Sequence, residues 1–538
     1  MFRRLTSSAL ALAAIGTPAF ADVTPEQVWQ SWVDYYQSMG YTVTEGGRDA
    51  AGSTLTVRDI QIAGGPETGK VTLSLPQAVL TDTGDGKVKT VFADSMDILL
   101  DGTEPEGASY SVPVKVAIPG NSMVTSGAPE DMVHAIDYPT VELELTTMTS
   151  DGTESPLPMN FALKNSTGSF HVVSGQPAQY DYDLKTEQMT FAGDVPDETD
   201  GRLKFAGSLD GIMGEGSMTA PTAISNLEEE MSAALKAGLA IGGKMQVGAI
   251  AATFEFSGTD EDGQPSSGAG KYDGKGFDGN FTLSRDGMGY QLGSDAMAFE
   301  MTSPQVPFPI SYAVESGSFN MQLPVTQSEE AQPFKFAYAL NGVSLGDAVW
   351  NMFDPTATLP RDPASLEIDL TGLLKVTKDL FALPAPDETA PADATDDATA
   401  EGVSPDAPAD MAEAEAETAE QDDEMADEPT GFEPVELNIN QVALNLLGAK
   451  ANASGNLKAV DEGSMEAPVG EIHAEFEGVN GLIEKLGNMG LIPQDQMMGV
   501  RMMLAMFAKP VDGAEDKLTT DLEFKEGGTI FANGQQIR

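Results

Sequence analysis

Period-two alternation of apolar and polar residues runs through most of this 538-residue chain. It begins after Tyr41, continues to about Ala220, resumes as far as Val325 and returns after residue 430. Clear examples are Leu55/Val57, Val71/Leu73/Leu75 and Val141/Leu143/Leu145. Such alternation places apolar side chains on one face of a strand. We therefore expect a mainly β fold: an antiparallel, elongated curved sheet or sandwich, with a few short amphipathic helices packed on its concave face or ends.

Five segments interrupt the strands with helical spacing. In the first, Thr24 and Gln27 can form a capping box and Pro25 occupies the first helical position. The apolar face of this helix carries Trp29 and Trp32, which we expect to pack onto the sheet without touching a ligand. The other predicted helices span about 222–237, 347–353, 480–488 and 494–508.

Composition divides the chain into five parts. Residues 385–430 contain 17 acids, no Lys or Arg, and little else but Ala, Pro, Thr and Ser, which predicts a disordered acidic linker. The predicted order is a signal peptide (1–21), an N-terminal helix with a β domain (22–220), a central β domain with helices (221–384), the linker (385–430) and a C-terminal segment of strands and a helical pair (431–538). Whether the parts on either side of the linker share one sheet is left open.

The first residues have the pattern of a secretory signal. Arg3 and Arg4 precede an apolar run over residues 5–15, and residues 17–21 (TPAFA) end in an A-x-A cleavage site. The mature chain would then begin at Asp22 and be periplasmic. No later run reaches the roughly 18 apolar residues of a membrane-spanning helix, so we expect no transmembrane segment after cleavage.

Charge and cysteine content exclude several classes of function. The formal net charge is -55, and it becomes -57 when Arg3 and Arg4 are removed with the signal. A field of that sign repels phosphate backbones and anionic lipid head groups, so we expect no nucleic-acid partner and no adsorption to a membrane through a basic patch. The absence of cysteine excludes disulfides, thiolate metal sites and a cysteine nucleophile.

One motif is typical of serine hydrolases. Residues 342–346 (GVSLG) fit the nucleophile elbow, and they lie between a predicted strand and a predicted helix. A triad would need His473 as its base, since it alone follows the serine in the usual order. Ser344 and Asp347 also fit a capping box, which explains the serine structurally. We therefore expect no enzyme here, with a hydrolase based on Ser344 as a remaining alternative.

Metal and cofactor motifs are not supported. His134, His171 and His473 are isolated from one another, and Asp260-Glu261-Asp262 lacks the spacing of a calcium loop. The glycine-rich stretch 268–279 fails the phosphate-loop and dinucleotide patterns, and we interpret it as tight turns. We expect no cofactor.

The predicted helix 494–508 is apolar nearly all round, apart from Arg501. Such a helix is either buried on all sides in a core, which is the commoner case, or in contact with something apolar. Methionine adapts to irregular partners, which suits contact with an amphiphile or a partner protein. The residues that would make this contact are Met497, Met498, Met502, Met503, Met506 and Phe507.

Alternating strands after a signal peptide are also typical of outer-membrane barrels. Three features argue against that architecture: the chain ends in Arg538 and not in an aromatic strand, aromatic residues make up only 7% of the chain, and helices interrupt the strand series.

Several motifs in a fixed order give a resemblance to a known family. They are the signal and tryptophan-bearing helix, Gly342-Val343-Ser344-Leu345 with Trp350 and Phe353-Asp354-Pro355, Leu359-Pro360-Arg361-Asp362-Pro363 before residues 366–372 (LEIDLTG), Gly490-Leu491-Ile492-Pro493, and Asn533-Gly534-Gln535. The chain resembles, over nearly all but its acidic linker, an uncharacterised alphaproteobacterial exported family catalogued as domain of unknown function number 2125. The resemblance implies no activity, site residue or cofactor. A looser architectural likeness connects it to AsmA-like β-rich envelope proteins, which hold lipid in an apolar groove.

The sequence thus predicts a periplasmic envelope protein without enzymatic activity. We expect it to bind or convey a lipid or another amphiphile. The alternative is a structural scaffold that binds other envelope proteins.

Overall fold

The computed structural model describes residues 23–66, 68–103, 107–196, 201–221, 230–260, 263–382, 431–460 and 465–538. In these residues 29 strands form one sheet, in which every pairing is antiparallel, together with five short helices. The mainly β, antiparallel fold expected from the alternation is therefore confirmed. The predicted signal peptide lies outside the described residues, as does the predicted linker.

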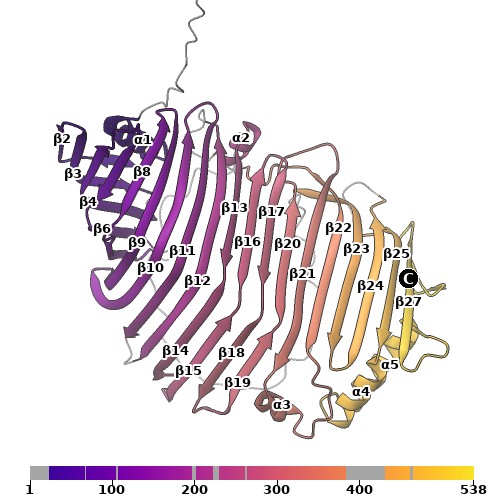
Figure 1. The fold of residues 1–538 in the computed structure, drawn as a ribbon. Helices are drawn as coiled ribbons and strands as arrows, with labels where there is room; N and C mark the ends of the chain where they lie inside the picture. The colour runs from indigo at the N-terminus through magenta and orange to yellow at the C-terminus, as the bar shows by residue number, and fades with distance from the viewer. Residues whose placement is uncertain are drawn as a thin grey trace, which may run out of the picture.

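The elements follow one another along the chain in the order drawn in Figure 1. The helices are α1 (Pro25–Ser38), α2 (Met231–Lys236), α3 (Asp347–Phe353), α4 (Val479–Asn488) and α5 (Gln494–Phe507). The first strands are β1 (Thr42–Thr44), β2 (Gly47–Ala51), β3 (Thr54–Gly64), β4 (Gly69–Asp82), β5 (Val88–Phe92), β6 (Ser95–Thr103), β7 (Ser109–Ala117), β8 (Ser122–Ala128), β9 (Asp131–Ser150), β10 (Thr153–Val173), β11 (Ala178–Pro196) and β12 (Arg202–Ala220). The central strands are β13 (Ala240–Val247), β14 (Ala249–Thr259), β15 (Pro265–Gly274), β16 (Phe277–Ser284), β17 (Gly287–Ser294), β18 (Met297–Ser303), β19 (Val306–Val314), β20 (Ser316–Leu323), β21 (Gln332–Leu345) and β22 (Ala364–Val376). The last strands are β23 (Phe432–Leu446), β24 (Ala449–Lys458), β25 (Val469–Glu477), β26 (Lys509–Pro510), β27 (Lys517–Lys525), β28 (Thr529–Ala532) and β29 (Gln535–Gln536).

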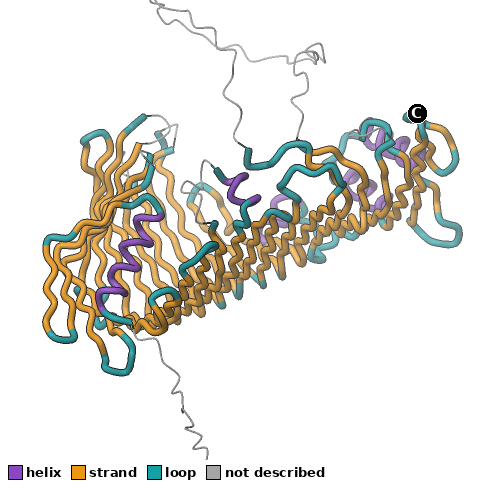
Figure 2. The backbone as a smooth tube through the Cα atoms, turned by 90° about the horizontal axis from the view of Figure 1, so that it is seen from above, coloured by secondary structure: helices purple, strands orange, loops and turns teal. Residues whose placement is uncertain are grey.

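Helix α1 lies inside a cup formed by the curled N-terminal strands (Figure 2). Its predicted capping box is present, because the Gln27 amide donates to Thr24 Oγ1 at 3.3 Å and the Thr24 amide donates to Gln27 Oε1 at 2.9 Å. Val28 and Trp29 are buried against Leu55 and other apolar residues of β3 and β4, as predicted for the tryptophan. The helix therefore closes the N-terminal core.

An irregularity crosses the sheet about midway along its strands. In β3 it lies at Asp59 and in β10 at Asn165, whose φ values are 51° and 52°. Further along the sheet, the irregularity divides each of four strand positions into two consecutive strands: β13/β14, β15/β16, β17/β18 and β19/β20. The break shifts the alternation by one residue, so that Val57 and Ile60 both face the α1 core although they are three positions apart. Apolar side chains consequently stay on the same face on both sides of the break.

The sheet continues across the predicted linker. Strand β22 pairs with β23 from Ser365 opposite Asn445 to Val376 opposite Phe432. Just beyond this ladder the Thr377 amide donates to the Gly431 carbonyl at 3.0 Å. The question that the sequence left open is thus answered: the parts before and after the linker share one sheet. The ladder also crosses the predicted boundary near residue 220, because β12 pairs with both β13 and β14.

The remaining helices lie on the same side of the sheet as α1 (Figure 2). Helix α2 covers an upper part of that side, where Leu235 packs with Leu239, Leu283 and Val325. Residues 222–229 of the helix predicted over 222–237 lie outside the described residues. Helices α3, α4 and α5 lie near the opposite strand ends and the C-terminal end of the sheet (Figure 1). None of the described helices combines the length and apolarity that crossing a bilayer requires.

Candidate functional site

A cavity of 830 Å³ lies between α1 and the curled strands. Its walls are mostly apolar and aromatic, and they include Trp32 and Tyr36 of α1, Met96 of β6, Val141 of β9 and Tyr180 of β11. Trp29 also contributes, and its indole Nε1 donates to Glu45 Oε1 at 2.7 Å. The two tryptophans pack onto the sheet as predicted, and the same packing leaves a space beside them.

Two titratable side chains of this cavity, His134 and Tyr138, are held uncharged. Thr125 Oγ1 and His134 Nδ1 lie 2.8 Å apart in a hydrogen bond, and the imidazole contacts the rings of Trp32 and Phe170 at centroid distances of 6.0 and 6.4 Å. Burial lowers the pKa of His134 to about 4, because the charged form would lose its hydration. Burial likewise raises the pKa of the Tyr138 hydroxyl to about 12. Both side chains are therefore neutral near pH 7.

Apolar residues continue from the cavity in rows across the strands. Residues directly opposite one another in antiparallel strands lie on the same face of a sheet. The first row starts at His134 and Phe170 in the cavity and runs through Tyr182, Gly216, Gly243, Phe281, Tyr290, Met321, Phe336, Leu370 and Ile439 to Gly455. A second row runs through Leu184, Gly214, Met245, Gly279, Leu292, Phe319, Tyr338, Ile368 and Val442 to Ala453. We call the surface formed by these two rows the apolar face.

The apolar face is incompletely covered by the described residues. Side chains in its second row are 42% (Leu184), 47% (Met245) and 41% (Leu292) exposed, and Tyr182 in the first row is 41% exposed. From β10 to β24 the rows cross β11, β12, β13, β16, β17, β20, β21, β22 and β23, which is ten strand spacings or about 48 Å. Monomeric soluble proteins seldom leave apolar patches of that extent open to water.

Glycines opposite aromatic rings make the apolar face smooth. A Cβ added to Gly216 would overlap the ring of Tyr182, which lies over the glycine from the neighbouring strand. The same arrangement joins Gly270 to Phe254 and Gly372 to Phe334. Rings that lie flat on the backbone cover the glycines and leave few protruding side chains.

These pairs correct the interpretation of residues 268–279 as tight turns. Most of that stretch lies in strands β15 and β16, with a short break at Lys275 and Gly276. Gly268 and Gly270 are needed because rings from β14 occupy the space above them. A glycine-rich run can therefore also lie in a strand whose glycines are covered by aromatic rings from the neighbouring strand. The sequence alone does not show which strand is the neighbour.

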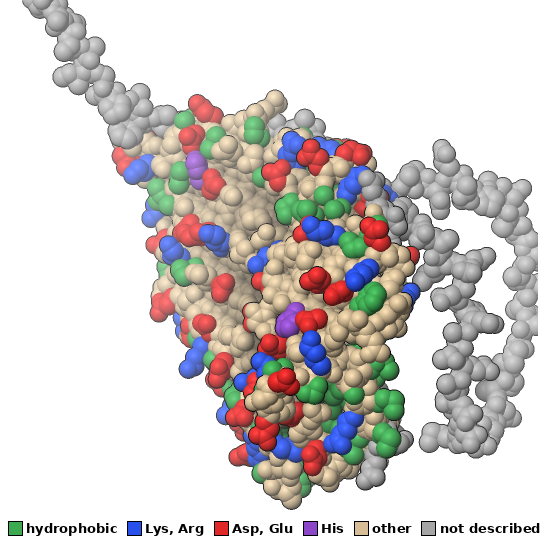
Figure 3. Space-filling view, turned by 90° about the vertical axis from the view of Figure 1, so that its right-hand side faces the viewer, with side chains coloured by type: hydrophobic (Ala, Val, Ile, Leu, Met, Phe, Trp, Pro, Cys, Tyr) green, Lys and Arg blue, Asp and Glu red, His purple; other side chains and the backbone are tan. Residues whose placement is uncertain are grey.

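The opposite face of the sheet is polar. Lys271 pairs with Glu300 across β15 and β18 at 3.1 Å, and the Gln188 amide donates to Asp210 at 2.7 Å. Viewed from the C-terminal end, acidic and basic side chains are scattered over the surface, and hydrophobic side chains gather towards its lower right (Figure 3). Water therefore solvates one face of the sheet, and the other face is available to an apolar ligand.

The structure places the predicted contact residues on an exposed helix. Met498, Met502, Met503, Met506 and Phe507 of α5 are all exposed, whereas Met497 packs against Gly487 of α4. The expectation that this helix is buried in a core is wrong, because these side chains are exposed. Helix α5 lies beside α4 near the C-terminal end of the sheet (Figure 1), where few of the described elements cover it.

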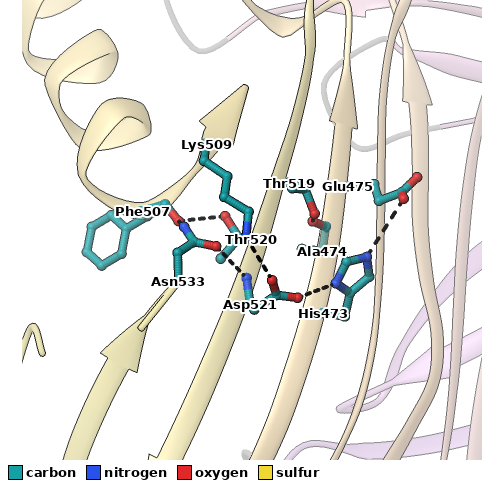
Figure 4. A network of polar contacts seen from close by, with 9 residues as sticks. All are labelled: His473, Ala474, Glu475, Phe507, Lys509, Thr519, Thr520, Asp521 and Asn533. Carbon is teal, nitrogen blue, oxygen red and sulfur yellow. Dashed lines mark hydrogen bonds and ion pairs between the residues drawn. The ribbon is translucent and has the colours of Figure 1, made fainter. Parts of the chain in front are cut away.

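The C-terminal end of α5 is firmly attached to the sheet (Figure 4). The carbonyl of Phe507 accepts hydrogen bonds from Thr520 Oγ1 at 2.7 Å and from Asn533 Nδ2 at 2.9 Å. Next to this anchor, hydrogen bonds from His473 and then Lys509 lower the pKa of the Asp521 carboxyl. The bonds to Phe507 satisfy a carbonyl that the helix end leaves without an intrahelical partner.

The elements of a serine hydrolase are not brought together. Ser344 lies in β21 and His473 in β25, and β22, β23 and β24 separate them by four strand spacings, or about 19 Å. The predicted capping role of Ser344 is also wrong, because α3 begins after Gly346 and no side chain caps it. His473 instead forms a hydrogen bond of 2.7 Å with Asp521 on the polar face.

No group of three or more potential metal ligands occurs within the described residues. Asp260 and Gly263 form a turn, in which the Gly263 amide donates to the Asp260 carbonyl at 2.9 Å. Residues 261 and 262 of the acidic cluster lie outside the described residues.

Comparison with protein families finds a match, which covers the C-terminal half of the chain. Residues 270–532 match the family described as an uncharacterized protein conserved in bacteria, DUF2125. This half of the chain belongs to DUF2125. The DUF2125 match begins in β15 and ends in β28, so it contains α3, α4 and α5, and it confirms the family resemblance over those residues. The α1 cup lies outside the matched range, and the AsmA likeness stays an analogy. None of the curated proteins and none of the solved structures matches the chain.

Sequence reasoning missed the cavity and the apolar face as sites. The helical spacing of Trp29 and Trp32 predicts packing alone, since such pairs also occur in ordinary cores. A usable signal was present in the glycines, because Gly214, Gly216 and Gly243 fall on the apolar side of strands that otherwise alternate regularly.

Proposed function

We propose that this chain is an exported protein without enzymatic activity that binds lipid on its apolar face. The observation that supports this most directly is the continuity of apolar rows from the cavity beneath α1 onto the apolar face. A cavity alone would suit a small ligand, and an isolated apolar patch would suit a protein. A cavity that opens into an extended smooth surface suits long hydrocarbon chains.

The extent of the apolar face supports a ligand with long chains. The two rows occupy about four residues along each strand over ten strand spacings, which corresponds to roughly 13 by 48 Å, or about 600 Å². That area equals the upper end of the range for the largest patch of a typical soluble monomer. Acyl chains can cover it without hydrogen bonds, since the rows present apolar side chains and glycine, while head groups stay in water at the rim.

The proposed location is the periplasm. It is supported by the signal pattern in residues 1–21 and by the absence of cysteine, which leaves the fold independent of the redox state of its compartment. The proposed lack of enzymatic activity is supported by the wide separation of Ser344 from His473.

Native mass spectrometry of the protein purified gently from its own envelope tests the proposal. We expect a discrete excess over the sequence mass that is lost on organic extraction and restored by adding phospholipid. A bare mass that does not change with added phospholipid would contradict lipid binding and favour the scaffold function.

A fluorescent probe on each face localises the ligand. Because the chain has no native cysteine, Tyr182→Cys on the apolar face and Asp183→Cys on the polar face each provide a unique labelling site. An environment-sensitive dye at position 182 should shift to the blue when phospholipid is added, and the dye at 183 should not. Equal responses at the two positions would place the lipid elsewhere.

A further inference from the structure

The methionine face of α5 is an apolar surface distinct from the apolar face of the sheet. We use this name for Met498, Met502, Met503 and Met506, which are 69%, 63%, 58% and 57% exposed. Spacings of three and four residues place these side chains along one broad side of the helix. The exposure belongs to an ordered helix, because α4 supports α5 on its other side and Thr520 and Asn533 hold its C-terminal carbonyl.

The charge around this face is unusual for the protein. The whole chain has 84 acids and 29 bases, yet the sequence from Lys485 to Lys509 contains three bases and one acid, Asp495. Lys509 pairs with Asp521 at 3.3 Å, whereas Arg501 is exposed and forms no ion pair within the described part of the chain. At physiological ionic strength charges act over about 8 Å, so charged residues far from α5 contribute little where the helix meets another surface.

The size of the methionine face argues against a protein partner. A helix of 14 residues is about 21 Å long and about 10 Å wide, so its exposed side offers about 200 Å². A stable protein–protein interface buries about 800 Å² on each partner. A second copy would also bring another large negative charge. Amphipathic helices at bilayer surfaces, in contrast, need only their apolar side to enter the interface by about 5–10 Å.

We propose that α5 inserts its methionine face into the surface of a lipid bilayer and holds the C-terminal end of the sheet there. Flexible thioether side chains fit between disordered acyl chains without a fixed complementary surface. Arg501 contributes attraction to anionic head groups. The inference does not depend on lipid being carried on the sheet, since membrane attachment is measured separately.

Flotation with vesicles tests it. The chain from residue 22 onward is mixed with vesicles of phosphatidylcholine, or of phosphatidylcholine with one part in five phosphatidylglycerol, and floated through sucrose. We expect the protein to float with both, and more with the anionic vesicles. Met502→Gln/Met506→Gln should reduce partitioning by about tenfold, because two apolar side chains become polar at a site that makes no core contact. Met352→Gln changes a methionine of α3 that is 65% exposed and should float as the unaltered chain does.

Two further measurements keep the test decisive. A dye on Met502→Cys should shift to the blue with vesicles, and a dye on Met352→Cys should not, whether or not the glutamine variant folds. Equal responses, or an unaltered chain that does not float, would overturn the proposal. Loss of a dimer in sedimentation velocity with Met502→Gln/Met506→Gln would also overturn it, since the occupant would then be a second copy.

Discussion

At the scale of single residues, His134 shows how the cavity selects neutral groups. Its imidazole is 3% exposed, makes one hydrogen bond to Thr125 and otherwise contacts rings. Protonation would leave a cation among Trp32 and Phe170 without a carboxylate to balance it in the contacts that His134 makes. The site therefore tolerates an apolar ligand near pH 7. Burial of an apolar ligand beside His134 becomes unfavourable when the imidazole gains a proton.

A pH dependence of stability follows from this residue. The pKa of His134 is about 4 in the folded protein and about 6.5 unfolded, so the unfolded chain binds more protons between these values. Stability from this group is complete above pH 6.5 and is lost as the pH falls towards 4, by about 2 kcal/mol between pH 7 and pH 5. Chemical denaturation at both pH values measures it. His134→Gln should lose this part of the pH dependence; an unchanged slope would mean that other groups cause it.

The glycines of the apolar face give a second prediction at this scale. A Cβ at Gly216 would overlap the Tyr182 ring, whereas a Cβ at Gly214, two residues away on the same face, would be 3.9 Å from that ring. Gly216→Ala should therefore lower the free energy of unfolding by about 1–3 kcal/mol, because the ring must leave its position. Gly214→Ala should change it by less than about 0.5 kcal/mol. Equal effects of the two substitutions in urea denaturation would refute the ring-over-glycine arrangement.

At the scale of elements, locally encoded features were predictable. The capping box of α1 and the bounds of α3 follow from residues within one turn of each other, and the structure has both. The environment of α5 was not predictable in the same way. Its composition suits a core equally well, and its exposure depends on its position at the last strands of the sheet, which no local pattern specifies. The family match adds no such information, because its description carries no site.

The anchor of α5 leads to a prediction about local opening. Thr520→Val removes the hydroxyl that donates to the Phe507 carbonyl and leaves Asn533 as the remaining donor. The loss of about 1 kcal/mol should accelerate amide exchange in residues 494–507 by about fivefold without changing exchange in the sheet. Thr519→Val is the matched control, since the Thr519 hydroxyl donates to Ala474 within the sheet at 3.3 Å. If both variants exchange alike in α5, the hydroxyl does not hold the helix.

At the scale of the whole molecule, the apolar face depends on registers that join strands far apart in the sequence. The alternation predicted the strand-rich regions, and it could not predict that Leu184 and Val442 belong to one row. The irregularity at Asp59, Asn165 and their counterparts shifts the alternation by one residue on the strands that it crosses, so a strict period of two would assign part of each of these strands to the wrong face. Register and this shift together explain why the strands could be predicted and the site could not.

The pairing of β22 with β23 permits a prediction about the acidic segment. Thr377 and Gly431 are hydrogen-bonded neighbours at the end of that ladder, so the segment between them leaves and re-enters the sheet at adjacent positions. Replacing residues 387–428 with a short Gly-Ser linker should therefore preserve the far-ultraviolet circular dichroism and the melting temperature to within a few degrees, since β22 and β23 would remain neighbours in a hairpin. A chain that ends at residue 382 should aggregate, because it leaves the long strand β22 unpaired at an exposed edge. If the shortened chain misfolds as the truncated one does, the acidic segment contributes contacts of its own to the fold. If the truncated chain stays monomeric and folded, residues 431–538 form a separate unit and not a continuation of the sheet.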